Sequence, residues 1–243
     1  MTLPKILLIT SYPPNFSDGN RRQLRPLVDK YASNIVWYSV IPPLPGFDRS
    51  QLTVPYAHGY LLSRPRYPLK PLRNWLNFEL WSRYLGMKAA QFGAEYGVSL
   101  VWAVVEVYTI RAAVAAARKL RVPLAISVMD DPVALYKAGW HFIPSERHLR
   151  YAFNRMIRFA SSHSAIGCAM ADYYREQYGI SATILYLGTD PASVLPQPVL
   201  DRARSPLMIG SVGNVYPNLK AEWETLVSAV RELNARWGTE KFR

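Results

Sequence analysis

Short runs of apolar residues alternate along the chain with longer stretches in which apolar positions recur with a helical period. The short runs predict β-strands and the longer stretches predict amphipathic helices. Strands that alternate with helices in this way are typical of a mostly parallel sheet covered by helices. The runs predict strands at Lys5–Ser11, Ile35–Ile41, Leu100–Val105, Leu124–Met129, His163–Cys168 and Thr183–Leu187. The longer stretches predict helices at Arg21–Tyr31, Pro71–Tyr96, Thr109–Leu120, Glu146–Ser161 and Ala169–Tyr178.

The pattern stops near residue 190 and then begins again. Residues 191–206 carry several prolines and no periodicity, which is typical of an interdomain linker. Beyond them, LMIGSVGN predicts a strand and LKAEWETLVSAVRELNARWG predicts a long amphipathic helix. One strand and one helix cannot bury a core of their own. We therefore predict an α/β fold with a doubly wound parallel sheet over residues 1–190, a linker at 191–206 and a truncated second α/β domain at 207–243.

One long region does not fit the alternation. Residues Pro42–Pro71 are rich in proline and show neither a strand period nor a helix period. A hairpin and an extended excursion are both compatible with such a composition, so the sequence assigns no element there.

Composition and charge narrow the class of protein. Of the 243 residues, 50% are hydrophobic, which is enough for a sizeable core, and the net charge of +12 favours an anionic partner. The single cysteine, Cys168, excludes an internal disulfide and fits a reducing compartment. At the end of a predicted strand, it is expected to be a small buried residue. No apolar run is long enough for a signal peptide or a membrane span, so the sequence predicts a cytoplasmic protein. The four histidines and the one cysteine lack the spacing of metal ligands, so no metal site is expected.

The stretch Ser63–Lys88, SRPRYPLKPLRNWLNFELWSRYLGMK, interleaves basic and aromatic residues. A basic helix with exposed aromatic side chains can lie on an anionic membrane, which would make the protein peripheral on the inner face of a membrane. The alternative is a core helix whose apolar residues pack against the sheet. No motif of an RNA-binding or DNA-binding module is present, so nucleic acid is not an expected partner.

The loop after the first predicted strand, SYPPNFSDGNRR, is longer than a strand-to-helix turn requires. It places Gly19, Asn20 and Arg21 at the start of a helix, where backbone N–H groups and the helix dipole can bind an anion. The alternative is an ordinary surface turn, because proline, aspartate, asparagine and glycine are turn formers.

Three acidic residues follow two other central strands. Asp130 and Asp131 come after Leu124–Met129, and Glu106 comes after Leu100–Val105. Ligands of open α/β sheets bind at this edge, where a carboxylate can orient an acceptor hydroxyl or accept its proton. For the aspartates the alternative is a cap ahead of Pro132, and for Glu106 it is an exposed loop acid.

Four stretches of the chain form an ordered set of motifs. They are SYPPNFSDGNRR, ISVMDDP, SAIGCAMADYYREQYGISATILYLGTD and IGSVGNVYPNLKAEWETLVSAVREL. Together they make the chain resemble the N-terminal two-thirds of group 1 (retaining) glycosyltransferases with the GT-B fold. The resemblance implies a Rossmann-like acceptor-binding domain followed by the start of a nucleotide-sugar-binding domain.

The resemblance also implies roles for single residues. Gly19, Asn20 and Arg21 would meet the diphosphate of a nucleotide-sugar donor, and Asn214 and Lys220 would approach it from the second domain. The donor is a substrate, so no cofactor is expected, and the acceptor would be a glycan or a lipid-linked glycan. The chain departs from the family pattern at Asn214, where an arginine is usual. Met129 also stands where many members carry histidine.

Two further expectations follow from the resemblance. The glutamate-rich motif that holds the donor would lie beyond Arg243, so the chain alone is expected to transfer no sugar at a useful rate. The leading hypothesis is therefore a glycosyltransferase or a fragment of one. The alternative is a non-catalytic binding module that keeps the acceptor or membrane site and works with a partner chain.

Overall fold

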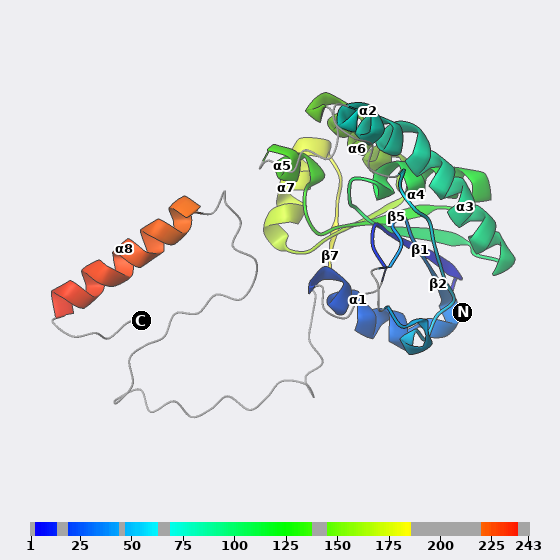
Figure 1. Ribbon diagram of the computed structural model, residues 1–243. Helices are drawn as coiled ribbons and strands as arrows, with labels where there is room; N and C mark the ends of the chain where they lie inside the picture. The colour runs from blue at the N-terminus through cyan, green and yellow to red at the C-terminus, as the bar shows by residue number, and fades with distance from the viewer. Residues whose placement is uncertain are drawn as a thin grey trace. The chain divides into compact units, whose positions relative to one another are not determined.

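A seven-stranded parallel sheet forms the centre of the structure, which is a computed structural model (Figure 1). The structure describes residues 3–13, 19–43, 47–62, 69–137, 145–185 and 220–237. The strand order is β3-β2-β1-β4-β5-β6-β7, and every neighbouring pair is parallel. The strands are β1 Ile6–Thr10, β2 Ile35–Ser39, β3 Tyr56–His58, β4 Leu100–Val104, β5 Leu124–Val128, β6 Ser162–Ala165 and β7 Thr183–Ile184.

Helices connect the strands and cover both faces of the sheet (Figure 1). The α-helices are α1 Gly19–Lys30, α2 Lys70–Leu76, α3 Ser82–Glu95, α4 Thr109–Leu120, α5 Pro132–Lys137, α6 Glu146–Phe159, α7 Cys168–Tyr178 and α8 Lys220–Trp237. Short 3₁₀ turns occur at Ala32–Asn34 and Arg49–Gln51, and a π-helical turn at Asn77–Trp81 joins α2 to α3. The predicted α/β fold class, with a doubly wound parallel sheet, is confirmed.

Alternate residues of each central strand enter two different cores. In β1, Leu7 and Ile9 face a core shared with α3, α4 and α6, whereas Leu8 faces a smaller core with Leu24 and Val28 of α1. Successive side chains of a strand point to opposite faces, so a strand covered on both sides reads as a continuous apolar run. This is why the sequence ILLIT at β1 predicted a buried strand correctly.

Helices α3 and α4 pack very closely on the larger core. A Cβ atom at Gly86 would lie 2.2 Å from the backbone oxygen of Ala112, so only glycine fits at this crossing. The other side of the contact is lined by alanines of α4, which leave room for the approach. Small residues on both helices therefore set their separation.

The structure adds elements that the sequence did not predict. Strand β3 lies inside the proline-rich Pro42–Pro71 region and pairs with β2 over three residues, from Trp37 with Tyr56 to Ser39 with His58. Helix α5 begins at Pro132, directly after the two aspartates. The long helix predicted at Pro71–Tyr96 contains the π-helical turn, where the Ser82 hydroxyl donates to the Asn77 carbonyl oxygen at 2.6 Å.

The expectation for Cys168 is wrong. Strand β6 ends at Ala165, and α7 begins at Cys168, whose side chain is exposed. Gly167 is the extended residue before the helix, with φ of −169°. The chain therefore leaves the sheet before Cys168 could enter the core.

The chain divides into two compact units, Met1–Asp190 and Pro191–Arg243. The helix predicted around residues 219–238 is confirmed as α8 in the second unit. Leu226 and Val227 on α8 are exposed. The strand predicted within LMIGSVGN, residues 207–214, and the predicted linker lie outside the described residues. In the described parts of the chain, no helix has the length and apolar character needed to span a membrane.

Candidate functional site at the carboxyl edge of the sheet

The sheet has its topological switch point between β1 and β4. The chain proceeds from β1 toward β2 and β3 on one side and then from β4 toward β7 on the other. The connections after β1 and β4 therefore lead to opposite sides of the sheet. In open α/β sheets, ligands bind outside the carboxyl ends of the strands at such a switch point.

A hydrogen bond joins the two loops at the switch point. The backbone N–H of Ser11, after β1, donates to Oε2 of Glu106, after β4, at 2.7 Å. The two residues are 95 positions apart in the sequence, so this contact exists only in the folded chain. The structure thus brings Glu106 to the start of the SYPPNFSDGNRR loop.

Hydrogen bonds of Thr10 with Trp37 and Tyr12 also hold the end of β1. The indole N–H of the fully buried Trp37 donates to the Thr10 hydroxyl at 2.8 Å, and that hydroxyl donates to the Tyr12 carbonyl oxygen. Ser11 itself is 2% exposed. Its hydroxyl oxygen is buried and has no hydrogen-bond partner among the described residues. A polar atom in this state can accept or donate a hydrogen bond to a bound group.

Thr109 fixes the turn that carries Glu106. Its hydroxyl accepts the Glu106 backbone N–H at 2.8 Å and donates to the Val104 carbonyl oxygen at 2.7 Å. Thr109 is fully buried, so these bonds are shielded from water. The sequence analysis did not identify this residue. A threonine three positions after Glu106, at a helix start, is the pattern that indicates such a turn.

Asp131 caps the short helix α5. Its Oδ1 accepts the backbone N–H groups of Val133 at 2.7 Å and Ala134 at 2.9 Å, and its Oδ2 accepts the Tyr174 hydroxyl at 3.2 Å. The capping role considered for this residue from the sequence is therefore present. Its neighbour Asp130 is exposed at the same strand end.

Three tyrosines near this edge remain neutral hydrogen-bond donors well above neutral pH. Burial raises the pKa of Tyr174, and the Asp131 carboxylate raises it further. Burial also raises the pKa of Tyr178 to about 12, with a second contribution from Asp131. For Tyr108, burial raises the pKa first and Tyr12 adds to the effect. The Tyr174 hydroxyl already donates its proton to Asp131, whereas the half-buried Tyr108 and Tyr178 can donate to an anion or a hydroxyl without carrying negative charge. The sequence analysis did not identify them.

The backbone of four of the five residues predicted to bind the donor lies within the described parts of the chain. Helix α1 begins at Gly19, so the backbone of Gly19, Asn20 and Arg21 forms its first turn. Lys220 begins α8 in the second unit, and Asn214 lies outside the described residues. In the described parts of the chain, no three His, Cys, Asp or Glu side chains are grouped as a metal site would require.

The fold is that of a solved protein with a bound nucleotide and sugar. The structure of Anabaena HepE in complex with UDP and glucose matches with a TM-score of 0.53 and 19% sequence identity, covering 77% of this chain and 45% of the HepE chain. A second HepE structure, in complex with UDP, has the same TM-score of 0.53 at 17% identity, covering 76% and 44% of the two chains. This chain therefore spans less than half of the length of HepE.

Other comparisons add little. The apo form of WaaB, a lipopolysaccharide outer core galactosyltransferase, matches with a TM-score of 0.49 and 18% identity, covering 84% of this chain and 50% of WaaB. No protein-family model and no curated protein matches the sequence. The comparisons with HepE thus support the α/β fold class.

Proposed function

We propose that this chain is a glycosyltransferase, or a fragment of one, that moves a sugar from a nucleotide-sugar donor to a glycan or lipid-linked acceptor. The observation that carries the proposal is the fold shared with HepE, whose structure holds UDP and glucose. The carboxyl edge of the sheet at the switch point is the position at which a ligand of such a sheet binds. The resemblance of four ordered sequence stretches to retaining GT-B transferases supports the same class.

Transfer from a nucleotide sugar leaves negative charge on the departing diphosphate. Backbone N–H groups at a helix start and a neighbouring cation stabilise such charge. We propose that the first turn of α1, at Gly19, Asn20 and Arg21, supplies these groups. The donor is consumed as a substrate, and the proposal involves neither a metal nor a cofactor.

The acceptor hydroxyl must be oriented and must lose its proton. Both oxygens of Asp131 are engaged in the cap of α5 and with Tyr174, and Asp130 is exposed beside them. We therefore propose that Asp130 orients the acceptor hydroxyl and accepts its proton. Asp131 is a positioning residue, because it caps α5. Glu106 holds the β1 loop and faces the same edge, so it positions the start of the donor loop.

Binding of a nucleotide sugar is the first test. Titration of the isotope-labelled chain with UDP-glucose is expected to shift the amide signals of Ser11, Gly19 and Asn20, because these follow β1 or begin α1. Arg21→Gln is expected to weaken the binding about tenfold, since it removes a cation beside the diphosphate. Amide shifts confined to residues far from the carboxyl edge, or no binding of any nucleotide sugar, would contradict the proposal.

Transfer of a labelled sugar tests the chemistry. Asp130→Asn is expected to lower the transfer rate about 100-fold or more, the contribution typical of a general base. The matched control is Glu95→Gln, which removes an exposed carboxylate from the last residue of α3. Transfer by this chain alone is expected to be slow, so the assay compares residual rates. Equal residual rates in the wild type and in Asp130→Asn would contradict the role of Asp130, and binding without any residual transfer would favour a non-catalytic binding module.

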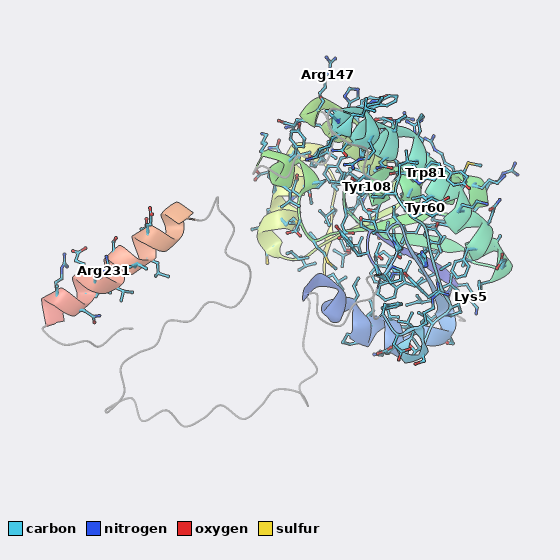
Figure 2. All side chains as sticks on the ribbon, in the orientation of Figure 1. Lys5, Tyr60, Trp81, Tyr108, Arg147 and Arg231 are labelled. Atoms are coloured by element: carbon cyan, nitrogen blue, oxygen red, sulfur yellow. The ribbon has the colours of Figure 1, made fainter. Side chains whose placement is uncertain are left out.

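We further propose that the surface of α2, the π-helical turn and α3 contacts an anionic membrane. Leu72, Leu80 and Met87 are exposed by about half of their surface, at 54%, 53% and 46%. Lys70 and Lys88 are exposed on the same helices. The tryptophans of this segment are only half-buried, and Trp81 packs against the exposed Tyr60 (Figure 2). Apolar side chains beside lysines suit a membrane interface.

Vesicle binding tests this surface. Vesicles with anionic lipid are expected to bind the protein and neutral vesicles are not, and added salt should weaken the binding. The double variant Leu80→Ser, Met87→Ser is expected to reduce binding about tenfold, because it removes most of the apolar surface available for insertion. The control is Leu226→Ser on α8. Equal binding to neutral vesicles, or equal loss in the control, would exclude an anionic interface on α2 and α3.

A further inference from the structure

A hollow lined by four arginines lies between α3, α4 and α6. Its volume is about 170 Å³, and its apolar lining consists of Ile110, Val114, Ala115 and Ala152. The arginines come from three separate helices: Arg83 from α3, Arg111 and Arg118 from α4, and Arg155 from α6. None of them belongs to the strand-end site described above.

The most buried of these arginines, Arg111, shares its carboxylate partner, Glu79, with Arg83. Arg111 is 11% exposed, and its Nη2 donates to Oε1 of Glu79 at 2.6 Å. Arg83 Nη2 donates to Oε2 of the same carboxylate at 3.0 Å. One negative charge thus serves two guanidiniums. Nε of Arg111 is buried and, within the described part of the chain, has no hydrogen-bond partner.

The other two arginines are held by aromatic rings. The guanidinium of Arg118 lies 5.0 Å from the ring centre of Phe159, and that of Arg155 lies 5.7 Å from the ring centre of Tyr151. Among the residues that the structure describes, neither forms an ion pair. Four guanidiniums against the one carboxylate of Glu79 therefore leave a surplus of three positive charges around one hollow.

We infer that this hollow binds a phosphate group. Like charges gathered in one concave site repel each other, and an anion relieves that repulsion. The planar guanidinium carries several N–H donors in a fixed fork that matches the oxygens of phosphate, and arginines from three helices can reach it from different sides. Exposed Tyr151 on α6 lies beside Arg155 near the rim, so the phosphate can belong to a lipid headgroup or to a soluble molecule.

Two binding measurements with one pair of variants test the inference. Calorimetry with inorganic phosphate and with glycerol phosphate reports a soluble ligand. Sedimentation with phosphatidylcholine vesicles that contain phosphatidic acid reports a lipid headgroup. The test variant is Arg118→Gln, Arg155→Gln, and the control is Lys119→Gln, Arg147→Gln, which removes the same charge from the same two helices. All four side chains are exposed, so both variants should fold, and Arg147 lies at the surface of α6 (Figure 2).

The wild-type chain and the control are expected to bind at least one of the phosphate probes with affinities within twofold of each other. The test variant is expected to lose at least tenfold in affinity. Binding of the protein to soluble phosphate, to the vesicles or to both supports the site, and the probe that binds identifies the source of the phosphate. Equal losses in the two variants would show diffuse attraction to a basic surface and overturn the inference, as would the absence of binding to every probe. Neither probe is a nucleotide sugar, so the result is independent of the proposed transfer.

Discussion

Replacement of Gly86 by alanine is expected to lower the free energy of unfolding by about 2–3 kcal/mol, although alanine is the better helix former. The new Cβ would lie 2.2 Å from the backbone oxygen of Ala112, and a backbone atom cannot rotate away as a side chain can. Helices α3 and α4 would have to separate, which would weaken the larger core. Urea unfolding followed by circular dichroism measures the loss, and a thermal midpoint lowered by about 5–10 °C would accompany it.

Gly93→Ala is the matched control, because it makes the same change in the same helix at another buried position. A Cβ there would meet methyl groups of Val98 at 3.0 Å and Leu7 at 3.1 Å, which can shift. Its unfolding free energy is expected to stay within about 1 kcal/mol of the wild type, since helix propensity offsets the tighter contact. Similar stabilities of the two variants would show that α3 and α4 can move apart easily and that Gly86 does not set their separation.

Replacement of Glu106 by alanine is expected to have the second large effect. The Ser11 N–H would lose the acceptor that ties the β1 loop to β4. A partly buried donor left without its charged partner costs about 1.5–3 kcal/mol. We therefore expect a loss of about 2 kcal/mol in unfolding free energy, together with weaker nucleotide-sugar binding because the donor loop is no longer fixed. Urea unfolding and calorimetric titration with UDP-glucose measure the two effects.

Glu106→Gln separates the hydrogen bond from the charge. The amide oxygen can still accept the Ser11 N–H, so this variant is expected to keep more than half of the stability that alanine loses. If Glu106 acts only by positioning the loop, transfer should also survive in Glu106→Gln. If its charge takes part in the reaction, transfer should fall while stability is kept. If the unfolding free energy of Glu106→Ala equals that of the wild type, the bond between Glu106 and Ser11 does not stabilise the link between the loop and β4.

Local pattern alone determined the central strands and most of the helices. The runs at β1, β2, β4 and β5 are apolar on both faces, and that reads directly as buried parallel strands. The alanine-rich IRAAVAAARKL predicts α4 because its intrinsic propensity and its apolar face agree. Glycines marked the end of α7, where Gly179 adopts φ of 66°. The strand order of the sheet was not accessible in this way.

The sequence also supplied the candidate residues at the carboxyl edge, but not what each one contacts. Glu106 was compatible with an exposed loop acid until the fold placed its carboxylate on Ser11, 95 residues away. For Asp131, capping and catalysis were both compatible with the pattern. The contact with Tyr174, 43 residues further on, shows that its second oxygen is engaged as well.

Tertiary structure alone decided the elements with weak local signals. Strand β3 consists of three residues in a proline-rich region, and it is a strand only because the edge of β2 offers hydrogen-bond partners. The arginine hollow has the same origin. Arg83, Arg111, Arg118 and Arg155 look like ordinary surface charges when each helix is read alone, and packing of three helices gathers them around one space. Periodicity records which side of an element is buried, whereas the neighbour that it meets depends on long-range packing.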